Sequence, residues 1–173
     1  MTVTERARRV RLLIFDVDGV MTDGRLYYTD GGEEMKAFDV RDGLGVKLLQ
    51  AGGVAAAIIT SRRSRLVELR AQSLGIVHLI QGVDDKAAAF AGLLESCGMQ
   101  ADAAGFVGDD VVDLPVLKRC GLAIAVPDAP EILKQQVHYV TRARGGRGAV
   151  REACELVLHA QNALAQVMEP YCR

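Results

Sequence analysis

The sequence reads Leu12-Leu13-Ile14-Phe15-Asp16-Val17-Asp18-Gly19-Val20 near its amino terminus, a short apolar run followed at once by two aspartates. Such a run is typical of a buried β-strand, whose carboxyl end then brings Asp16 and Asp18 to one place. Charges there are costly to desolvate unless a cation or a substrate compensates them, and open α/β sheets bind ligands at this end of their strands. The stretch therefore predicts a Mg²⁺ site with one carboxylate free to act as a nucleophile. A plain Asp-Gly turn is the alternative.

Short apolar runs alternate with amphipathic stretches along the rest of the chain. The predicted strands are 12–15, 54–59, 76–80, 104–107, 122–126 and 137–140, and the predicted helices are 44–51, 62–74, 86–97, 114–119, 131–136 and 148–167. Strands that alternate with helices imply crossover units and a parallel sheet. Strands that are apolar almost throughout indicate a sheet covered on both faces. We therefore expect an α/β fold, a three-layer Rossmann-like parallel sheet with helices on both faces.

One segment interrupts this alternation. Residues 25–29 and 34–39 flank Asp30-Gly31-Gly32, and this pattern predicts a β-hairpin with a glycine-containing turn. Because the segment directly follows the two aspartates, we expect the hairpin to project from the carboxyl edge of the sheet, over the site. A surface hairpin without a role is the alternative.

Composition excludes several classes of protein. The 173 residues are the size of a single domain, 1–173, and half of them are hydrophobic. A net charge of −1 argues against nucleic acid or an acidic membrane surface as a partner. The four cysteines show no C-x-x-C spacing and are interpreted as reduced thiols of an intracellular protein. No stretch approaches the roughly 18 apolar residues of a membrane helix, and the first apolar run is too short for a signal peptide. We expect a soluble, cytoplasmic protein.

Polar side chains suited to phosphoryl transfer follow three further strands. The second strand ends at Thr60-Ser61-Arg62-Arg63, where a hydroxyl and the N–H groups of a helix start can cradle a phosphate, although Thr and Ser are also ordinary N-caps. Lys86 begins a helix, where a cation opposes the helix dipole unless an anion is near. The fourth strand ends in Gly108-Asp109-Asp110, with Asp113 shortly after. These acids are expected to face Asp16 across the switch point of the sheet and to supply the oxygen ligands that Mg²⁺ prefers.

The ordered set D-x-D, T, K and G-D-D-x-x-D resembles the haloacid dehalogenase superfamily, whose members are mostly phosphohydrolases that act through an aspartyl-phosphate. The resemblance covers nearly the whole chain and implies four catalytic residues. Asp16 is implied as the nucleophile, and Asp18 as the acid that protonates the leaving oxygen and then activates water. Thr60 and Lys86 are implied to hold the phosphoryl oxygens.

The same resemblance implies a Mg²⁺ site. Its ligands would be Asp16, the backbone carbonyl of Asp18, and Asp109, with Asp110 and Asp113 in support. Metal and lysine together would neutralise the charge that keeps a carboxylate from attacking an anionic phosphate.

Enzymes of this superfamily usually carry a cap domain, and this chain has no room for one. The span from Asp18 to Thr60 holds only the hairpin and one helix, and the span from Thr60 to Lys86 holds a single crossover. Such a site stands open to water. The capless members that this chain resembles form tetramers in which one subunit's hairpin and tail close the neighbour's site. A homotetramer is therefore implied, with the loop 144–148, and Arg147 in it, at a neighbouring site.

Within the capless branch, the resemblance implies a small anionic sugar phosphate as the substrate. It rests on the segments 16–24, 38–45, 108–115 and 145–152. The implied substrate contacts are Asp18, Asp39, Lys47, Arg62, Arg70 and Lys86. Arginine and lysine suit the carboxylate and phosphate of a sugar acid phosphate. The sequence departs from the branch at Ser61, where glycine is common, at Asp39, where asparagine is frequent, and at Leu44, where an aromatic residue is frequent.

Three alternatives compete with this interpretation. A signalling receiver domain also combines paired acids, Thr and Lys around Mg²⁺, but its phosphoacceptor precedes the Thr in mid-chain, and here no acid ends the strand before Thr60. A non-catalytic phosphatase-like module is disfavoured because the catalytic positions are intact. An enzyme of the same branch that acts on another sugar acid, such as a nonulosonate 9-phosphate, stays open.

Overall fold

The computed structural model describes residues 1–172, which contain a six-stranded sheet and a separate two-stranded hairpin. The strands of the large sheet are β1 (Leu12–Phe15), β4 (Ala55–Thr60), β5 (His78–Gln81), β6 (Ala104–Gly108), β7 (Leu122–Ala125) and β8 (Tyr139–Val140). All its pairs are parallel, in the order β5-β4-β1-β6-β7-β8. The predicted parallel sheet is confirmed, with strand ends that differ by one or two residues.

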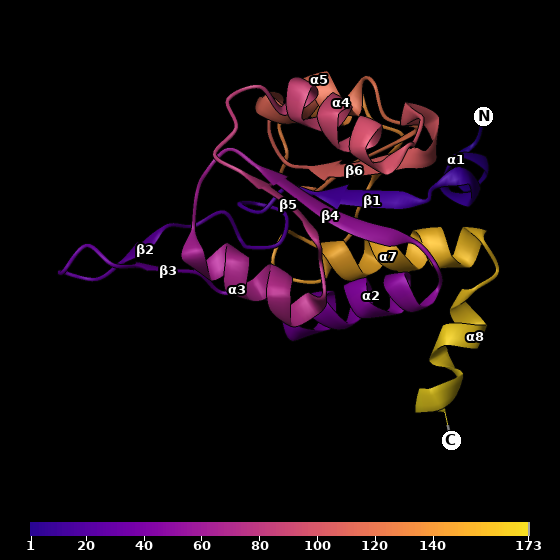
Figure 1. The fold of residues 1–173 in the computed structure, drawn as a ribbon, viewed down its shortest axis with the longest axis horizontal. Coiled ribbons are helices and arrows are strands. Elements are labelled where there is room, and N and C mark those ends of the chain that lie inside the picture. Colours follow the sequence, from indigo (N-terminus) through magenta and orange to yellow (C-terminus); the bar gives the residue numbers. More distant parts are fainter. Residues whose placement is uncertain (173) are drawn as a thin grey trace.

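Helices cover both faces of this sheet, as the sequence predicts (Figure 1). On one face lie α2 (Val40–Ala51), α3 (Arg65–Leu74) and α7 (Ala149–Ala160), and on the other lie α4 (Lys86–Cys97) and α5 (Leu114–Leu117). The remaining helices are α1 (Val3–Arg9), α6 (Glu131–Lys134) and α8 (Leu164–Met168), and short 3₁₀ turns occupy Ala101–Ala103, Val111–Asp113 and Glu169–Tyr171. No helix in residues 1–172 is both long enough and apolar enough to cross a membrane.

The core lies between these layers. Every residue of β1 is fully buried, because β4 and β6 flank this strand and helices cover both of its faces. Phe15 from β1, Phe106 from β6 and Phe90 from α4 are the largest buried side chains, and burial of each contributes about 1.5–3 kcal/mol. A rigid central strand therefore ends directly at Asp16.

Several helix boundaries differ from the prediction. Helix α2 begins at Val40 rather than 44, because Asp39 caps it by accepting a hydrogen bond from the Arg41 N–H at 2.6 Å. Helix α3 begins at Arg65 rather than 62, because the extended residue Ser64 precedes it. Residues 61–63 therefore form a loop, and the predicted helix-start cradle directly after Thr60 is wrong.

The predicted helix 148–167 is two helices, α7 and α8, separated by residues 161–163. Asn162 has a φ of 58°, a left-handed conformation that asparagine tolerates. The N–H of Ala163 donates to the Leu158 carbonyl and that of Asn162 to the His159 carbonyl, which is the Schellman arrangement that ends helices. The apolar spacing continues past this point, so periodicity alone does not show the break. Helix α1, which the sequence analysis does not include, begins with a capping box of Thr2 and Glu5.

The predicted hairpin is present, but its strands β2 (Tyr27–Tyr28) and β3 (Glu34–Met35) are shorter than the predicted 25–29 and 34–39. It extends away from the body of the protein on the side where β1 ends (Figure 1).

Candidate active site

The functional side chains meet at the carboxyl edge of three adjacent strands. Asp16 follows β1, Thr60 ends β4 and Asp109 follows β6, and β1 lies between the other two strands. A pocket of about 250 Å³ opens there, lined by Asp16, Asp18, Gly24, Thr60, Ser61, Arg62, Asp109, Asp110 and Val112. The expected convergence of the strand-end residues is therefore observed.

Asp16 and Lys86 form a buried ion pair beneath this pocket. The Lys86 Nζ lies 2.9 Å from Asp16 Oδ2 and 2.6 Å from Asp113 Oδ1, and the three side chains are almost fully buried. Although burial alone would lower it, the two carboxylates raise the pKa of Lys86, so the lysine stays charged. Lys86 begins α4, as predicted, and these carboxylates are the anions that its position at a helix start requires.

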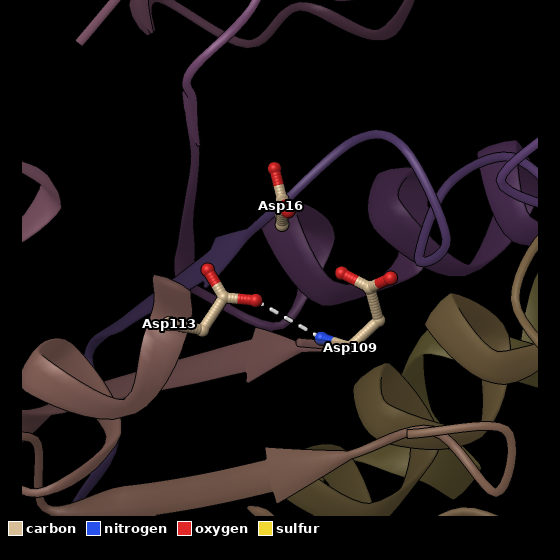
Figure 2. Close-up of side chains that lie close together, drawn as sticks. All are labelled: Asp16, Asp109 and Asp113. Carbon is tan, nitrogen blue, oxygen red and sulfur yellow. Dashed lines mark hydrogen bonds between the residues drawn. The ribbon is translucent and has the colours of Figure 1, made fainter. Parts of the chain in front are cut away.

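Three carboxyl groups crowd around one space, as Figure 2 shows. One oxygen from each of Asp16, Asp109 and Asp113 lies within 4.8 Å of the others. Burial and the Asp113 charge raise the pKa of Asp16 to about 6. Burial, with the charges of Asp16 and Asp113, raises the pKa of Asp109 to about 8. Lys86 alone does not balance this negative charge.

The cluster suits a hard divalent cation. Asp113 has both oxygens engaged, one by Lys86 and the other by the backbone N–H of Asp109 at 3.0 Å. The side chain of Asp109, by contrast, accepts no hydrogen bond from residues 1–172. Asp16 and Asp109 are thus the carboxylates best placed to hold Mg²⁺, which takes oxygen ligands and one or two carboxylates. Asp113 instead orients Lys86 and the loop that carries Asp109.

The loop after β1 comes very close to this cluster. Gly19 has a φ of +90°, and a Cβ on it would lie 2.0 Å from Asp109 Oδ2, so only glycine fits. The buried Thr22 hydroxyl accepts hydrogen bonds from the N–H groups of Gly19 at 3.3 Å and Gly24 at 3.2 Å. These contacts fix the loop that carries Asp18 beside Asp109.

Asp18 faces the hairpin side of the pocket. Its Oδ1 is paired with Lys36 Nζ, and its Oδ2 lies 3.7 Å from Arg62 Nε. Glu34 on the hairpin in turn lies 3.3 Å from Lys36 and 2.8 Å from Arg62. The hairpin therefore covers one side of the site in its own chain.

The predicted substrate contacts separate into two groups. Asp18 and Arg62 line the pocket, and Lys86 lies beneath it. Asp39 caps α2, Lys47 is exposed on the same helix, and neither lines the pocket. Arg70 packs its guanidinium 5.5 Å from the Phe38 ring and donates to the Asp39 carbonyl at 2.9 Å. The chain by itself does not bring these three residues to Asp16.

The loop 144–148 contacts the site of its own chain. A Cβ on Gly145 would lie 1.8 Å from the Gly19 carbonyl oxygen, and the N–H of Gly146 donates to the Val20 carbonyl at 2.9 Å. On α2, the buried carboxylate of Asp42 accepts from the Arg151 N–H at 2.8 Å and so anchors the start of α7 behind this loop. The loop 144–148 therefore packs against the loop after β1, which carries Asp18. The predicted contact with a neighbouring subunit stays a prediction.

A larger hollow, of about 490 Å³, lies between β8 and α7 and shares no residue with the acidic pocket; it is lined by Tyr139, Arg142, Glu152, Glu155, Leu156, His159 and Leu164. Its Glu152 is already bonded to the Tyr139 hydroxyl at 2.7 Å and to the Ala143 N–H at 2.9 Å. The cluster of three carboxyl groups belongs to the smaller pocket, not to this hollow.

Sequence reasoning missed Lys36 and Glu34. Strand β3 ends at Met35, so Lys36 follows the strand, and no strand periodicity indicates that both side chains turn toward Asp18. The direct bond between Lys86 and Asp113 was also missed, because two motifs far apart in sequence show no sign of pairing.

Comparisons with known proteins agree with this geometry. The profile of the haloacid dehalogenase-like hydrolase family matches residues 46–152. The 3-deoxy-D-manno-octulosonate 8-phosphate phosphatase KdsC of Yersinia pestis is 51% identical over 162 residues, which are 94% of this chain and 87% of that protein.

Two solved structures are also close. The 3-deoxy-D-manno-octulosonate 8-phosphate phosphatase of Moraxella catarrhalis, in complex with magnesium ion, phosphate ion and KDO molecule, has a TM-score of 0.96 and 41% identity, and covers 98% of this chain and 97% of its own. A probable YrbI family phosphatase of Pseudomonas syringae has a TM-score of 0.97 and 45% identity, and covers 99% of this chain and 97% of its own.

Proposed function

The chain belongs to the haloacid dehalogenase-like hydrolase family, and we propose that it is a Mg²⁺-dependent phosphatase that hydrolyses 3-deoxy-D-manno-octulosonate 8-phosphate to the free sugar acid and phosphate, a step in lipopolysaccharide biosynthesis. The observation that carries the chemistry is the buried Asp16 carboxylate, held at 2.9 Å by Lys86 at the floor of an acidic pocket. The names of the relatives at about half identity support the choice of substrate.

The residues present divide the reaction into two steps. A carboxylate oxygen of Asp16 attacks phosphorus, and the bond to the leaving oxygen breaks as Asp18 gives that oxygen a proton. Asp18 then takes a proton from water, whose oxygen attacks the aspartyl-phosphate and releases phosphate. Thr60 and Lys86 hold the phosphoryl oxygens during both steps. Asp16, Asp109 and the backbone carbonyl of Asp18 would hold Mg²⁺, which would supply positive charge that offsets repulsion between carboxylate and phosphate.

A comparison of substrates tests this function. The purified protein with Mg²⁺ should hydrolyse 3-deoxy-D-manno-octulosonate 8-phosphate with a kcat/KM at least about a hundredfold above that for a nonulosonate 9-phosphate or for p-nitrophenyl phosphate. Phosphate release measures each rate. A preference for the nonulosonate ester would assign the protein to another sugar acid phosphate. The residues that would explain such a change of substrate are Ser61, Asp39 and Leu44, where the sequence departs from the capless branch.

We also propose a homotetramer. The hairpin exposes Leu26, Tyr28 and Met35, whose exposed fractions are 46%, 57% and 53%, a concentration of apolar area that a free flap seldom carries. With no cap domain, a neighbouring subunit is the natural cover for the open side of the pocket.

Mutation of the hairpin tests the assembly. The wild-type protein should scatter light as a tetramer at micromolar concentration, and Leu26→Ser with Met35→Ser should shift it toward monomers by removing buried apolar area. Val77→Ser, which alters an exposed apolar residue away from the hairpin, should leave the tetramer intact. A wild-type monomer with full activity would contradict the proposal.

A cytoplasmic location is part of the same proposal. The four cysteines are free in the described residues, as is usual in a reducing compartment. Neither the balanced charge nor the acidic pocket offers a surface for nucleic acid.

A further inference from the structure

The leaving group of the proposed reaction must lie beside Asp18, because Asp18 gives it a proton. Asp18 and Arg62 line the pocket at this point. They belong to a ring of four charged side chains, here called the charge ring, whose other members are Lys36 and Glu34. Lys36 joins Asp18 to Glu34, and Arg62 joins Glu34 back to Asp18. The two positive and two negative charges of the ring therefore balance one another in the free chain. They do so at the place where the sugar must enter.

Within the charge ring, Glu34 bridges both cations with a single oxygen. Its Oε1 lies 3.3 Å from Lys36 Nζ and 2.8 Å from Arg62 Nη2. Its other oxygen accepts a hydrogen bond from the Ser64 hydroxyl at 3.0 Å. Arg62 also donates to the Tyr28 hydroxyl at 3.2 Å. Lys36, Arg62 and Ser64 thus hold a carboxylate, which in the free chain belongs to the protein itself.

Lys36 is the unusual member of the charge ring. It lies on an exposed hairpin, yet its side chain is only 2% exposed, whereas that of Arg62 is 42% exposed. A cation removed from water in this way needs anionic partners, and loss of such a partner is costly. Lys36 must therefore keep an anionic partner when the leaving group enters the site.

We propose that Lys36 and Arg62 form the binding site for the carboxylate of the leaving sugar acid, that Glu34 occupies this site in the free chain, and that Lys36 is a specificity-determining residue. This inference rests on the proposed function. A leaving group with its own carboxylate exchanges with Glu34 and keeps both cations paired. A neutral leaving group has no carboxylate that can take the place of Glu34. Its entry would therefore separate Glu34 from Lys36 and Arg62 without giving these cations a new anion.

Substitution of Lys36 is the main test. In the full chain with Mg²⁺, Lys36→Met should raise KM for 3-deoxy-D-manno-octulosonate 8-phosphate at least about tenfold more than it raises KM for an aldose phosphate, which has a similar leaving oxygen but no carboxylate. Lys36→Arg should restore most of the lost affinity. Equal losses on both substrates would show that Lys36 acts through Asp18 or the fold, and unchanged kinetics would show no role. Either result overturns the inference.

Substitution of Glu34 gives an independent test, in which KM for the sugar acid phosphate should change in the opposite direction. Glu34→Gln removes the competing carboxylate and should lower KM for the sugar acid phosphate about two- to fivefold. If Glu34→Gln instead raised KM as much as Lys36→Met does, the charge ring would serve only to hold the hairpin in place, and the inference would be wrong. Glu33→Gln, which changes an exposed hairpin carboxylate outside the charge ring, is the matched control and should leave both substrates unaffected.

The wild-type protein separates the two ways of failing. If it hydrolyses p-nitrophenyl phosphate but no sugar acid phosphate, the proposed function fails and takes this inference with it. If it hydrolyses the sugar acid phosphate and Lys36→Met leaves that KM unchanged, only this inference fails.

Discussion

Replacement of Asp16 by asparagine is expected to lower turnover by more than about 10⁴-fold, because the amide cannot form the aspartyl-phosphate. Thr60, Lys86 and the acidic pocket remain in this variant, so substrate binding is affected far less than chemistry. Phosphate release under single-turnover conditions measures the loss directly. A variant that kept the wild-type rate would exclude Asp16 as the nucleophile.

The fold should survive this substitution. The raised pKa of Asp16, about 6, means that burial and Asp113 penalise its charged form above that pH. The neutral amide removes the penalty, and Lys86 keeps its bond to Asp113 at 2.6 Å. The metal-free Asp16→Asn protein should therefore melt at or above the wild-type temperature at neutral pH. A marked fall in melting temperature would show that lost turnover reflects misfolding.

A matched control distinguishes the site from general effects of removing a carboxylate. Asp102 is an exposed aspartate before β6, at the opposite edge of the sheet, where it pairs with Arg9. Asp102→Asn should retain wild-type turnover, since its carboxylate is far from the pocket.

The sequence predicted the sheet and the centre of the site because both depend on local pattern. An apolar run followed by a carboxylate predicts a buried strand that carries this carboxylate at its carboxyl end. Strand ends in a parallel sheet share an edge, so Asp16, Thr60 and Asp109 could be placed together without coordinates. Lys86 was detected for a related reason, since its charge conflicts with its place at a helix start.

What the sequence could not predict depends on contacts between distant segments. The bond from Lys36 to Asp18 is set by how the hairpin folds back, and no periodicity encodes that direction. The end of α7 is set by one left-handed asparagine inside a continuing apolar pattern. Asp39, Lys47 and Arg70, which were assigned by resemblance, lie outside the pocket of the single chain, so their assignment rests on the proposed tetramer.

Removal of Mg²⁺ is expected to abolish phosphatase activity and, in addition, to make the stability of the protein depend on pH. The reason is Asp109, whose pKa rises from 3.8 to about 8 in the metal-free chain through burial and the charges of Asp16 and Asp113. Between these two values the folded chain binds a proton at Asp109 that the unfolded chain has lost. Unfolding then releases a proton, so the free energy of unfolding falls as pH rises through this range.

Bound Mg²⁺ should remove this pH dependence, because it compensates the carboxylates that destabilise each other. At about pH 6 the metal must displace the proton on Asp109, whereas at about pH 9 the carboxylate is already ionised, so the gain from Mg²⁺ should be larger at the higher pH. Thermal melts with EDTA and with excess Mg²⁺ at both pH values measure the difference. Phosphate release in the same buffers should vanish with EDTA and return when Mg²⁺ is added.

Asp109→Asn is the variant that isolates the cause. It removes the group with the raised pKa and one carboxylate of the cluster, so its metal-free melting temperature should change little with pH and should respond weakly to Mg²⁺. Asp102→Asn, which alters the exposed aspartate before β6, should keep the wild-type pH dependence of the Mg²⁺ response. Equal stabilisation by Mg²⁺ at both pH values in the wild-type protein, or full activity in EDTA, would contradict a metal site built on Asp109, because only an ionised carboxylate in that pocket couples the metal to the proton.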